Sequence, residues 1–184
     1  HTGDLDITDK VNLVGRGGMA VIDAGEIDRV LHIIEAPDVD EPQISLLKNL
    51  TITGGRADRV GGGILNDDAG VLVDNVNLRD NQAGSETGVG GAGGGFYNRQ
   101  GHFSTSDFTV ENNLAYGPGG GAYFEHASWL ANDNQLFTGN RSMGGRGGGG
   151  IYFDRESHVD IKDLFVISNE TLANGGGVWN AGQL

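Results

Sequence analysis

Five polar residues follow the glycine-rich segments of this chain at fixed distances and could do acid–base chemistry: Arg99, Glu125, His126, Asp154 and Arg155. If the segments stack on one another, Glu125 and Asp154 come close together, flanked by the imidazole and the two guanidinium groups. Two carboxylates about 5–5.5 Å apart form the geometry of a retaining glycosidase. However, strand spacing brings any two stacked residues near that distance, and charged residues beside a turn are usually solvated. We therefore expect no catalytic residues and keep polysaccharide cleavage as the alternative.

Two signatures recur along the chain and define a repeat. The first is a glycine triplet followed by apolar or aromatic residues: GGGIL (61–65), GGGFY (93–97), GGGAY (119–123), GGGIY (148–152) and GGGVW (175–179). The second ends in asparagine: NVNLRDN (75–81), DFTVENN (107–113), NQLFTGN (134–140) and DLFVISN (163–169). The last glycines of the triplets are 32, 26, 29 and 27 residues apart, as their positions 63, 95, 121, 150 and 177 show. A period of this length is typical of a solenoid.

Short runs of alternating apolar residues between turn residues indicate strands, and no segment shows a helical period. The sequence therefore predicts an all-β fold, a right-handed, single-stranded parallel β-helix of about six coils, with the handedness that parallel crossovers prefer. We expect one domain over residues 1–184, with less regular coils in 1–60 and the repeats in 61–184, and a longer chain could continue it. NLTITGG (49–55) is interpreted as an earlier copy of the second signature, and KVNLVGR (10–16) as the first.

The recurrent glycines and asparagines have structural explanations. Glycine adopts positive φ and lets neighbouring backbones approach without a Cβ collision. We therefore predict turn glycines at Gly63, Gly95, Gly121, Gly150 and Gly177. A side-chain amide both donates and accepts, so equivalent amides on successive coils can bond each other. This predicts a buried asparagine ladder of Asn81, Asn113, Asn140 and Asn169.

The second residue after each triplet is usually aromatic: Tyr97, Tyr123, Tyr152 and Trp179. The residue before it in each copy is apolar, and successive strand residues face opposite sides. That apolar column is therefore the expected core, and the aromatic column becomes an outward stripe that could contact a glycan or a protein. The alternative is that long loops fold over the stripe and bury it.

Composition excludes several classes of function. There are 25 acidic and 12 basic residues, so the net charge of −13 argues against nucleic acid and against anionic membranes. The absence of cysteine removes disulfides and thiolate metal sites, and no apolar run is long enough to span a bilayer. We expect no cofactor or metal, with calcium left open because Asp4, Asp6, Asp67 and Asp68 offer oxygen ligands.

The paired signatures resemble the GGA[ILV] and FxxN repeats of the polymorphic outer-membrane protein family and the β-helix repeats of large bacterial surface proteins. The resemblance covers about residues 45–184, with glycine in place of alanine at the third position, and phenylalanine in only one of the four FxxN copies. It implies a structural or adhesive protein, secreted or at the cell surface, with a surface glycan or a host or cell-surface protein as partner. The main alternative is a carbohydrate-active enzyme, a polysaccharide lyase or glycoside hydrolase, or a carbohydrate-binding fragment. Because neither end reads as a cap, we also expect head-to-tail self-association into fibres, or else a fragment of a longer solenoid.

Overall fold

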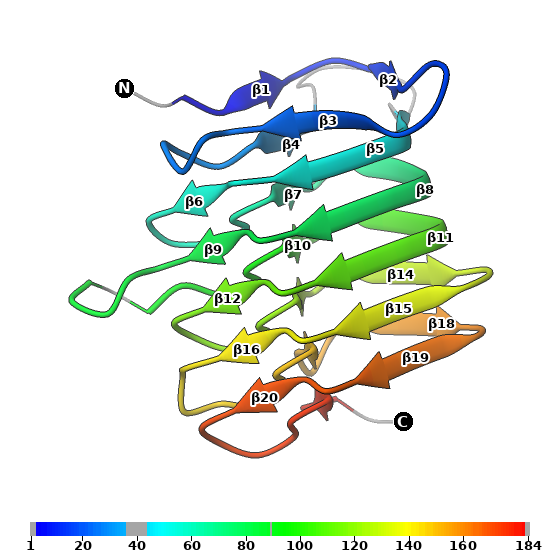
Figure 1. Cartoon of the computed structure of the whole chain (residues 1–184). Coiled ribbons are helices and arrows are strands. Elements are labelled where there is room, and N and C mark those ends of the chain that lie inside the picture. Colours follow the sequence, from blue (N-terminus) through cyan, green and yellow to red (C-terminus); the bar gives the residue numbers. More distant parts are fainter. Residues whose placement is uncertain (1–2, 36–43, 89, 183–184) are drawn as a thin grey trace.

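The computed structural model describes residues 3–35, 44–88 and 90–182, and it is a parallel β-solenoid of about six turns. Figure 1 shows the coils stacked along one axis, from the N-terminal coil in blue to the C-terminal coil in red. The described residues contain strands and turns but no helix. The predicted all-β fold and the number of coils are confirmed.

Three parallel sheets run along the solenoid, and each coil contributes to them in turn. Sheet A contains β1 (Leu5–Ile7), β4 (Leu31–Ile34), β7 (Ile64–Asp67), β10 (Phe96–Arg99), β13 (Ala122–Glu125), β17 (Ile151–Phe153) and β21 (Val178–Asn180). Sheet B contains β2 (Asn12–Val14), β3 (Ala20–Asp23), β5 (Ile44–Thr53), β8 (Gly70–Arg79), β11 (His102–Glu111), β14 (Ser128–Ala131), β15 (Gln135–Thr138), β18 (His158–Ile161) and β19 (Leu164–Ile167). Sheet C contains β6 (Arg56–Ala57), β9 (Gln82–Ala83), β12 (Leu114–Ala115), β16 (Arg141–Ser142) and β20 (Glu170–Thr171).

The first coil is assigned differently from the sequence interpretation. The segment KVNLVGR carries β2, which pairs with the start of β5, because Leu13 is in register with Leu47. The residues that pair with LTIT (50–53) are those of β3, where Ile22 is in register with Ile52. Reading KVNLVGR as the first copy of the second signature was therefore wrong, and the copy is AVID (20–23), which lacks the terminal asparagine.

Sheet B bends sharply in the middle of each coil. The bend falls on residues with a left-handed backbone, at Asn49, Asn75 and Asp107 within β5, β8 and β11, with φ of 53°, 54° and 50°. Asn and Asp adopt this conformation more readily than other residues with a side chain. In the next two coils the equivalent residues are Asn134 and Asp163, and here the bend separates β14 from β15 and β18 from β19.

The core lies inside the coil and follows the predicted apolar column. Ile64, Phe96, Ala122 and Ile151 are fully buried, while Val178 in the last coil is 39% exposed. Phe103, Phe108 and Trp129 of sheet B pack against them in one continuous cluster. The Trp129 indole N–H donates to Thr105 Oγ1 at 2.9 Å, so this large side chain is buried without an unsatisfied donor.

The four predicted ladder asparagines hydrogen-bond in series at the turn between sheets B and C. The Nδ2 of Asn81, Asn113 and Asn140 donates to the Oδ1 of the next asparagine at 3.1, 3.0 and 2.8 Å. That same Oδ1 also accepts from the backbone N–H of the preceding asparagine, at 3.0 Å in each case. The first three are buried, and Asn169 in the last complete coil is half-buried.

The three glycines of each triplet are needed for different reasons, as the triplet at 119–121 shows. Positive φ occurs at the first glycine, Gly119, with φ of 69°, and not at the last glycine, to which the sequence analysis assigned the turn. Gly120 and Gly121 are required by space instead. A Cβ on Gly120 would lie 2.3 Å from the carbonyl oxygen of Gly149, and a Cβ on Gly121 would lie 2.7 Å from that of Gly150. The other last glycines that a following coil covers, Gly63, Gly95 and Gly150, are similarly crowded, whereas a Cβ on Gly177 in the last coil would meet only Val166 at 3.0 Å.

Apolar side chains remain exposed at both end coils of the described structure. Val21 and Ile27 are 61% and 81% exposed in the first coil, and Phe165, Ile167 and Leu172 are 54%, 52% and 69% exposed in the last. In the coil before the last, Leu136 and Thr138 are in register with Phe165 and Ile167 and are half-buried.

We predict that Asn113→Ala lowers the free energy of unfolding by about 1–3 kcal/mol, because the amide partners in the adjacent coils stay buried without their bonds. The Nδ2 of Asn113 also donates to the Leu78 carbonyl at 2.9 Å. Four groups therefore lose a hydrogen bond: the Leu78 carbonyl, Asn140 Oδ1, and the side-chain and backbone N–H groups of Asn81. Urea denaturation measures the effect. Asn12→Ala, at an exposed position in β2, is the control, and equal stability of the two variants would refute the ladder's role.

We predict that Gly120→Ala destabilises the protein by about 1–3 kcal/mol or more, because the added methyl group collides with a backbone that cannot move alone. Gly145→Ala is the matched control, because no atom lies within 4 Å of its Cβ position. Thermal melts followed by circular dichroism compare the two. A Gly120→Ala melt as high as that of Gly145→Ala would contradict the explanation given for the triplets.

Candidate functional site

Four of the five candidate catalytic residues line one polar groove at the corner between sheets A and B. This corner groove has a volume of about 700 Å³. Its walls come from the ends of β13 and β17, the residues after them, and loops of the last two coils. They include Glu125, His126, Asp154, Arg155, Glu156, Arg146, Asn174 and the edges of Tyr123, Tyr152 and Trp179. The stacking predicted from the repeats therefore does bring Glu125, His126, Asp154 and Arg155 together.

The carboxylate of Asp154 is committed to the turn that carries it. Its Oδ1 accepts from Ser157 Oγ at 2.7 Å and from the Glu156 N–H at 3.1 Å, and its Oδ2 accepts from the His126 N–H at 3.0 Å. The Asp154 side chain is only 15% exposed. Three donors thus hold this carboxylate, and these bonds give Asp154 a structural role in the turn.

Glu125 is tied to the neighbouring coil by a hydrogen bond. Its Oε2 accepts from the hydroxyl of Tyr97 at 2.7 Å. His126 follows it in a left-handed conformation, with φ of 50°, so it forms the corner itself. Its ring nitrogens lie 3.5 Å from Asp154 Oδ2 and from Glu156 Oε2, and its side chain is 46% exposed. These contacts explain the polar residues at this corner as parts of the turn.

Arg99, the fifth candidate, turns away from the corner groove. Its guanidinium binds both oxygens of Asp67, with Nε to Oδ1 at 2.8 Å and the second bond from Nη2 to Oδ2. The Arg99 hydrogen bonds hold the pKa of the Asp67 carboxyl below its usual range. Asp67 was also a candidate calcium ligand, but both of its carboxylate oxygens are already bonded to Arg99.

The aromatic column faces outward from the coil but is covered. Tyr97, Tyr123 and Tyr152 are 7%, 8% and 6% exposed, so of the two alternatives from the sequence the covered stripe is the one found for them. They form a second apolar cluster with Leu65, and half-buried Trp179 packs against it. Consecutive rings are nearly parallel, with centroids 4.9 Å apart for Tyr97 and Tyr123 and 4.7 Å apart for Tyr123 and Tyr152. Because both faces of Tyr123 are used in this stack, its edge and hydroxyl group, rather than a ring face, line the corner groove.

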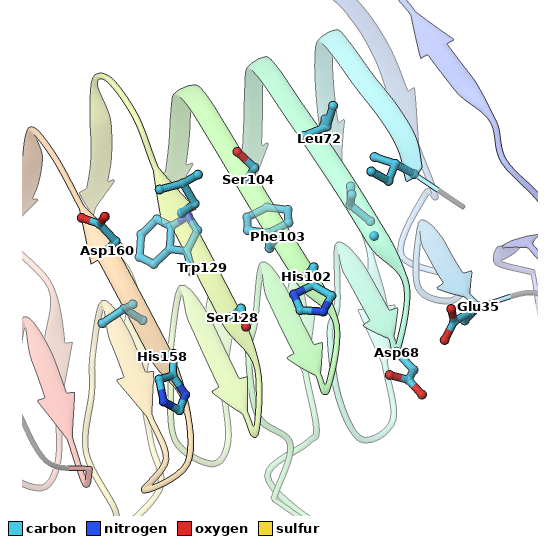
Figure 2. A pocket seen from close by; sticks show the side chains of 15 residues that line it. Glu35, Asp68, Leu72, His102, Phe103, Ser104, Ser128, Trp129, His158 and Asp160 are labelled. Carbon is cyan, nitrogen blue, oxygen red and sulfur yellow. The ribbon is translucent and has the colours of Figure 1, made fainter. Parts of the chain in front are cut away.

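A second groove lies on the outer face of sheet B and has a volume of about 600 Å³. Figure 2 shows it crossing successive strands, with His102, Ser128 and His158 nearer to Asp68 and with Leu72 and Ser104 farther along their strands. The register explains this arrangement: Ile44, Gly70, His102, Ser128 and His158 form one row, and Leu72, Ser104, Leu130 and Asp160 form the next. We call this the sheet B groove.

The sheet B groove is apolar, with an acidic margin. Ile44, Leu72 and Leu130 are 42%, 43% and 46% exposed. Glu35, Asp68 and Asp160 contribute carboxylates, while no Lys or Arg is among the described residues that line the groove. Exposed apolar side chains gathered in one depression are typical of a binding surface.

The sheet B groove was not predicted from the sequence, although the order of apolar residues in two of its strands indicates it. Strands with one face toward the core should alternate apolar and polar residues. The segments VLV (71–73) and WLA (129–131) instead have three apolar residues in succession. The middle residue of each, Leu72 and Leu130, necessarily faces outward.

Comparisons with known proteins add no relative: no protein-family model matches the chain, and neither the curated proteins nor the solved structures contain a significant match. Among the residues that the structure describes, none forms a helix with the length and apolar character needed to cross a bilayer.

We predict that stability declines in alkali because of the tyrosine stack. Burial, and then the hydrogen bond to Glu125, raises the pKa of Tyr97 far above its usual value. Burial, and then the neighbouring Tyr152, raises the pKa of Tyr123 to about 12. Unfolded tyrosine ionises near pH 10, so the stabilisation is complete below about pH 10 and is lost as the pH rises toward the folded-state values.

Urea denaturation at pH 9 and pH 11 measures this loss. We expect it to be smaller in Tyr97→Phe and Tyr123→Phe than in the wild type. Tyr116→Phe, outside the stack, is the control. An alkaline loss that is identical in all four proteins would show that the stack is not its source.

Proposed function

We propose that this protein is a structural and adhesive β-solenoid of the extracellular space or the cell surface. The sheet B groove then binds an extended segment of a partner protein with apolar and basic side chains. The observation that carries the proposal is the combination of exposed Leu72 and Leu130 with three carboxylates and no Lys or Arg among the described residues of the groove. The complementary partner brings apolar contacts and positive charge.

The dimensions of the sheet B groove fit a short segment. The groove crosses five strands, so it is about 19 Å long at the usual strand spacing, which corresponds to about six residues of extended chain. The excess of 25 acidic over 12 basic residues adds a field that attracts a cationic partner over a longer range. The resemblance to surface β-helix repeats supports the proposed location.

Synthetic peptides test the proposal. We predict that a hexapeptide of alternating Leu and Lys binds, as measured by fluorescence anisotropy, while alternating Leu and Glu does not. A Lys and Ser hexapeptide of the same charge separates groove binding from general attraction to an acidic protein. Leu130→Ser should weaken binding of the Leu and Lys peptide about tenfold, because an apolar contact in the groove is lost. Val21→Ser, at an apolar residue of β3 that is 61% exposed, is the control.

Two outcomes would overturn the adhesive proposal. One is equal binding of the Leu and Lys and the Lys and Ser peptides. The other is unchanged binding by Leu130→Ser. The first result would mean that charge alone attracts the peptide, and the second would mean that the sheet B groove takes no part.

Polysaccharide cleavage is the second candidate function, because Glu125, His126, Asp154 and Arg155 line the corner groove together. It is less well supported, since Asp154 is already held by three donors. Release of new chain ends from a polysaccharide by the wild type, with loss of this activity in Glu125→Gln, would favour it over adhesion.

Head-to-tail stacking of copies stays a prediction. It is supported by Val178 of the last coil, which is 39% exposed, whereas its equivalents Ile151 and Ala122 are fully buried beneath a following coil. Further coils of a longer chain would cover Val178 equally well.

A further inference from the structure

A cluster of two carboxylates and one imidazole lies on the outer face of sheet A in the first two coils. Asp6 of β1 is in register with His32 of β4, and His32 is in register with Leu65, which begins the tyrosine column. Asp4 lies in the bend just before β1, and one of its carboxylate oxygens lies within 4.8 Å of ligand atoms of Asp6 and His32. Where later coils have stacked aromatic rings, the first coils thus have groups that can bind a metal ion.

The geometry of these groups suits coordination of a single ion. One potential ligand atom from each of Asp4, Asp6 and His32 lies within 4.8 Å of the others. His32 Nδ1 is 3.2 Å from Asp6 Oδ1. Two ligands on a tetrahedral ion with bonds of about 2.0–2.1 Å are separated by about 3.3 Å. Small movements of the side chains would therefore bring all three donors to one centre.

Two buried atoms of the cluster lack partners, which is a separate observation. The Asp4 side chain is 4% exposed, and its Oδ2 accepts from Arg29 Nη1 at 2.9 Å. Its Oδ1 is buried and has no hydrogen-bond partner among the described residues, and the same holds for Nε2 of His32. A buried carboxylate oxygen without a partner is costly, and a bound cation would remove that cost.

The ligand types select the class of metal. An imidazole with carboxylates suits zinc and similar transition-metal ions, whereas calcium takes six to eight oxygen ligands. Arg29 beside Asp4 reduces the negative charge of the cluster, which further disfavours an ion that is held by charge alone. Of the four aspartates considered for calcium, only Asp4 and Asp6 belong to this cluster.

We propose that Asp4, Asp6 and His32 bind one zinc-class divalent ion that fastens the first coil to the second. Water completes the coordination on the exposed side of Asp6, whose side chain is 55% exposed. Because the ligands come together only in the folded coil, the ion stabilises the native state. Affinity falls on acidification, since the ligating groups must be unprotonated.

Calorimetric titration of the EDTA-treated, dialysed protein with zinc chloride tests this proposal. We expect one ion per chain and a higher melting temperature with zinc. His32→Gln and Asp6→Asn should each weaken binding by at least about tenfold, since losing even an outer-shell partner costs that much. His126→Ala, whose ring lies 3.5 Å from two other carboxylates, is the control that should keep full affinity.

Circular dichroism establishes whether each variant folds. No saturable zinc binding by the wild type, or unchanged binding by a folded His32→Gln, overturns the proposal. If the variants do not fold, assigned imidazole resonances of the wild type decide. The His32 ring protons must be the first to shift when zinc is added, and an earlier shift at another histidine refutes the site.

Discussion

The structure depends on the hydrogen bonding between successive coils, which places every residue beside its equivalent at a spacing of about 4.8 Å. A residue type that suits the solenoid must therefore pack or bond against itself. Asparagine does so because its amide donates and accepts, as in the Asn113–Asn140 contact at 3.0 Å. Tyrosine does so by stacking, at 4.7 Å between Tyr123 and Tyr152. Glycine is needed where two backbones approach so closely that a Cβ on Gly149 would lie 2.2 Å from the Gly176 carbonyl oxygen.

This self-complementarity explains what the sequence could predict. Residues at equivalent positions of the repeat lie in one column of the solenoid. The spacing of the repeats therefore predicts the fold, the number of coils, the core column and the asparagines that form the ladder. The predictions failed where the result depended on residues outside the repeated column. The exposure of the tyrosines depends on loops that cover them, and positive φ depends on where within the triplet the chain turns. His32 was not predicted as a site residue, because it lies 26 residues from Asp6 and both residues belong to coils that lack the glycine triplet. A buried pair at Asn66 and Asn98, with a contact of 2.9 Å, was missed because only two coils carry it.

Differences between coils are tolerated mainly on outward positions, and the candidate sites are found there. The inward column of Ile64, Phe96, Ala122 and Ile151 is apolar throughout, whereas the outward row that contains Leu72 also holds Ser104, Leu130 and Asp160. The same holds for the aromatic column, which begins with Asp6 and His32. In the proposed account, the ladders provide a rigid scaffold, the sheet B groove binds a partner and the metal ion secures the first coil. Asp154 differs from these site residues. Its hydrogen bonds hold a turn in place, so it belongs to the scaffold.

Native-state hydrogen exchange tests most directly the claim that the ladder holds the coils together. The backbone N–H groups of Asn81, Asn113 and Asn140 each donate to the next asparagine side chain at 3.0 Å. If the ladder is the cooperative centre of the fold, these three amides exchange only through global unfolding, with the free energy of unfolding measured in denaturant. Exchange of the same amides through local opening, at rates like those of the loop around Gly145, would contradict the account.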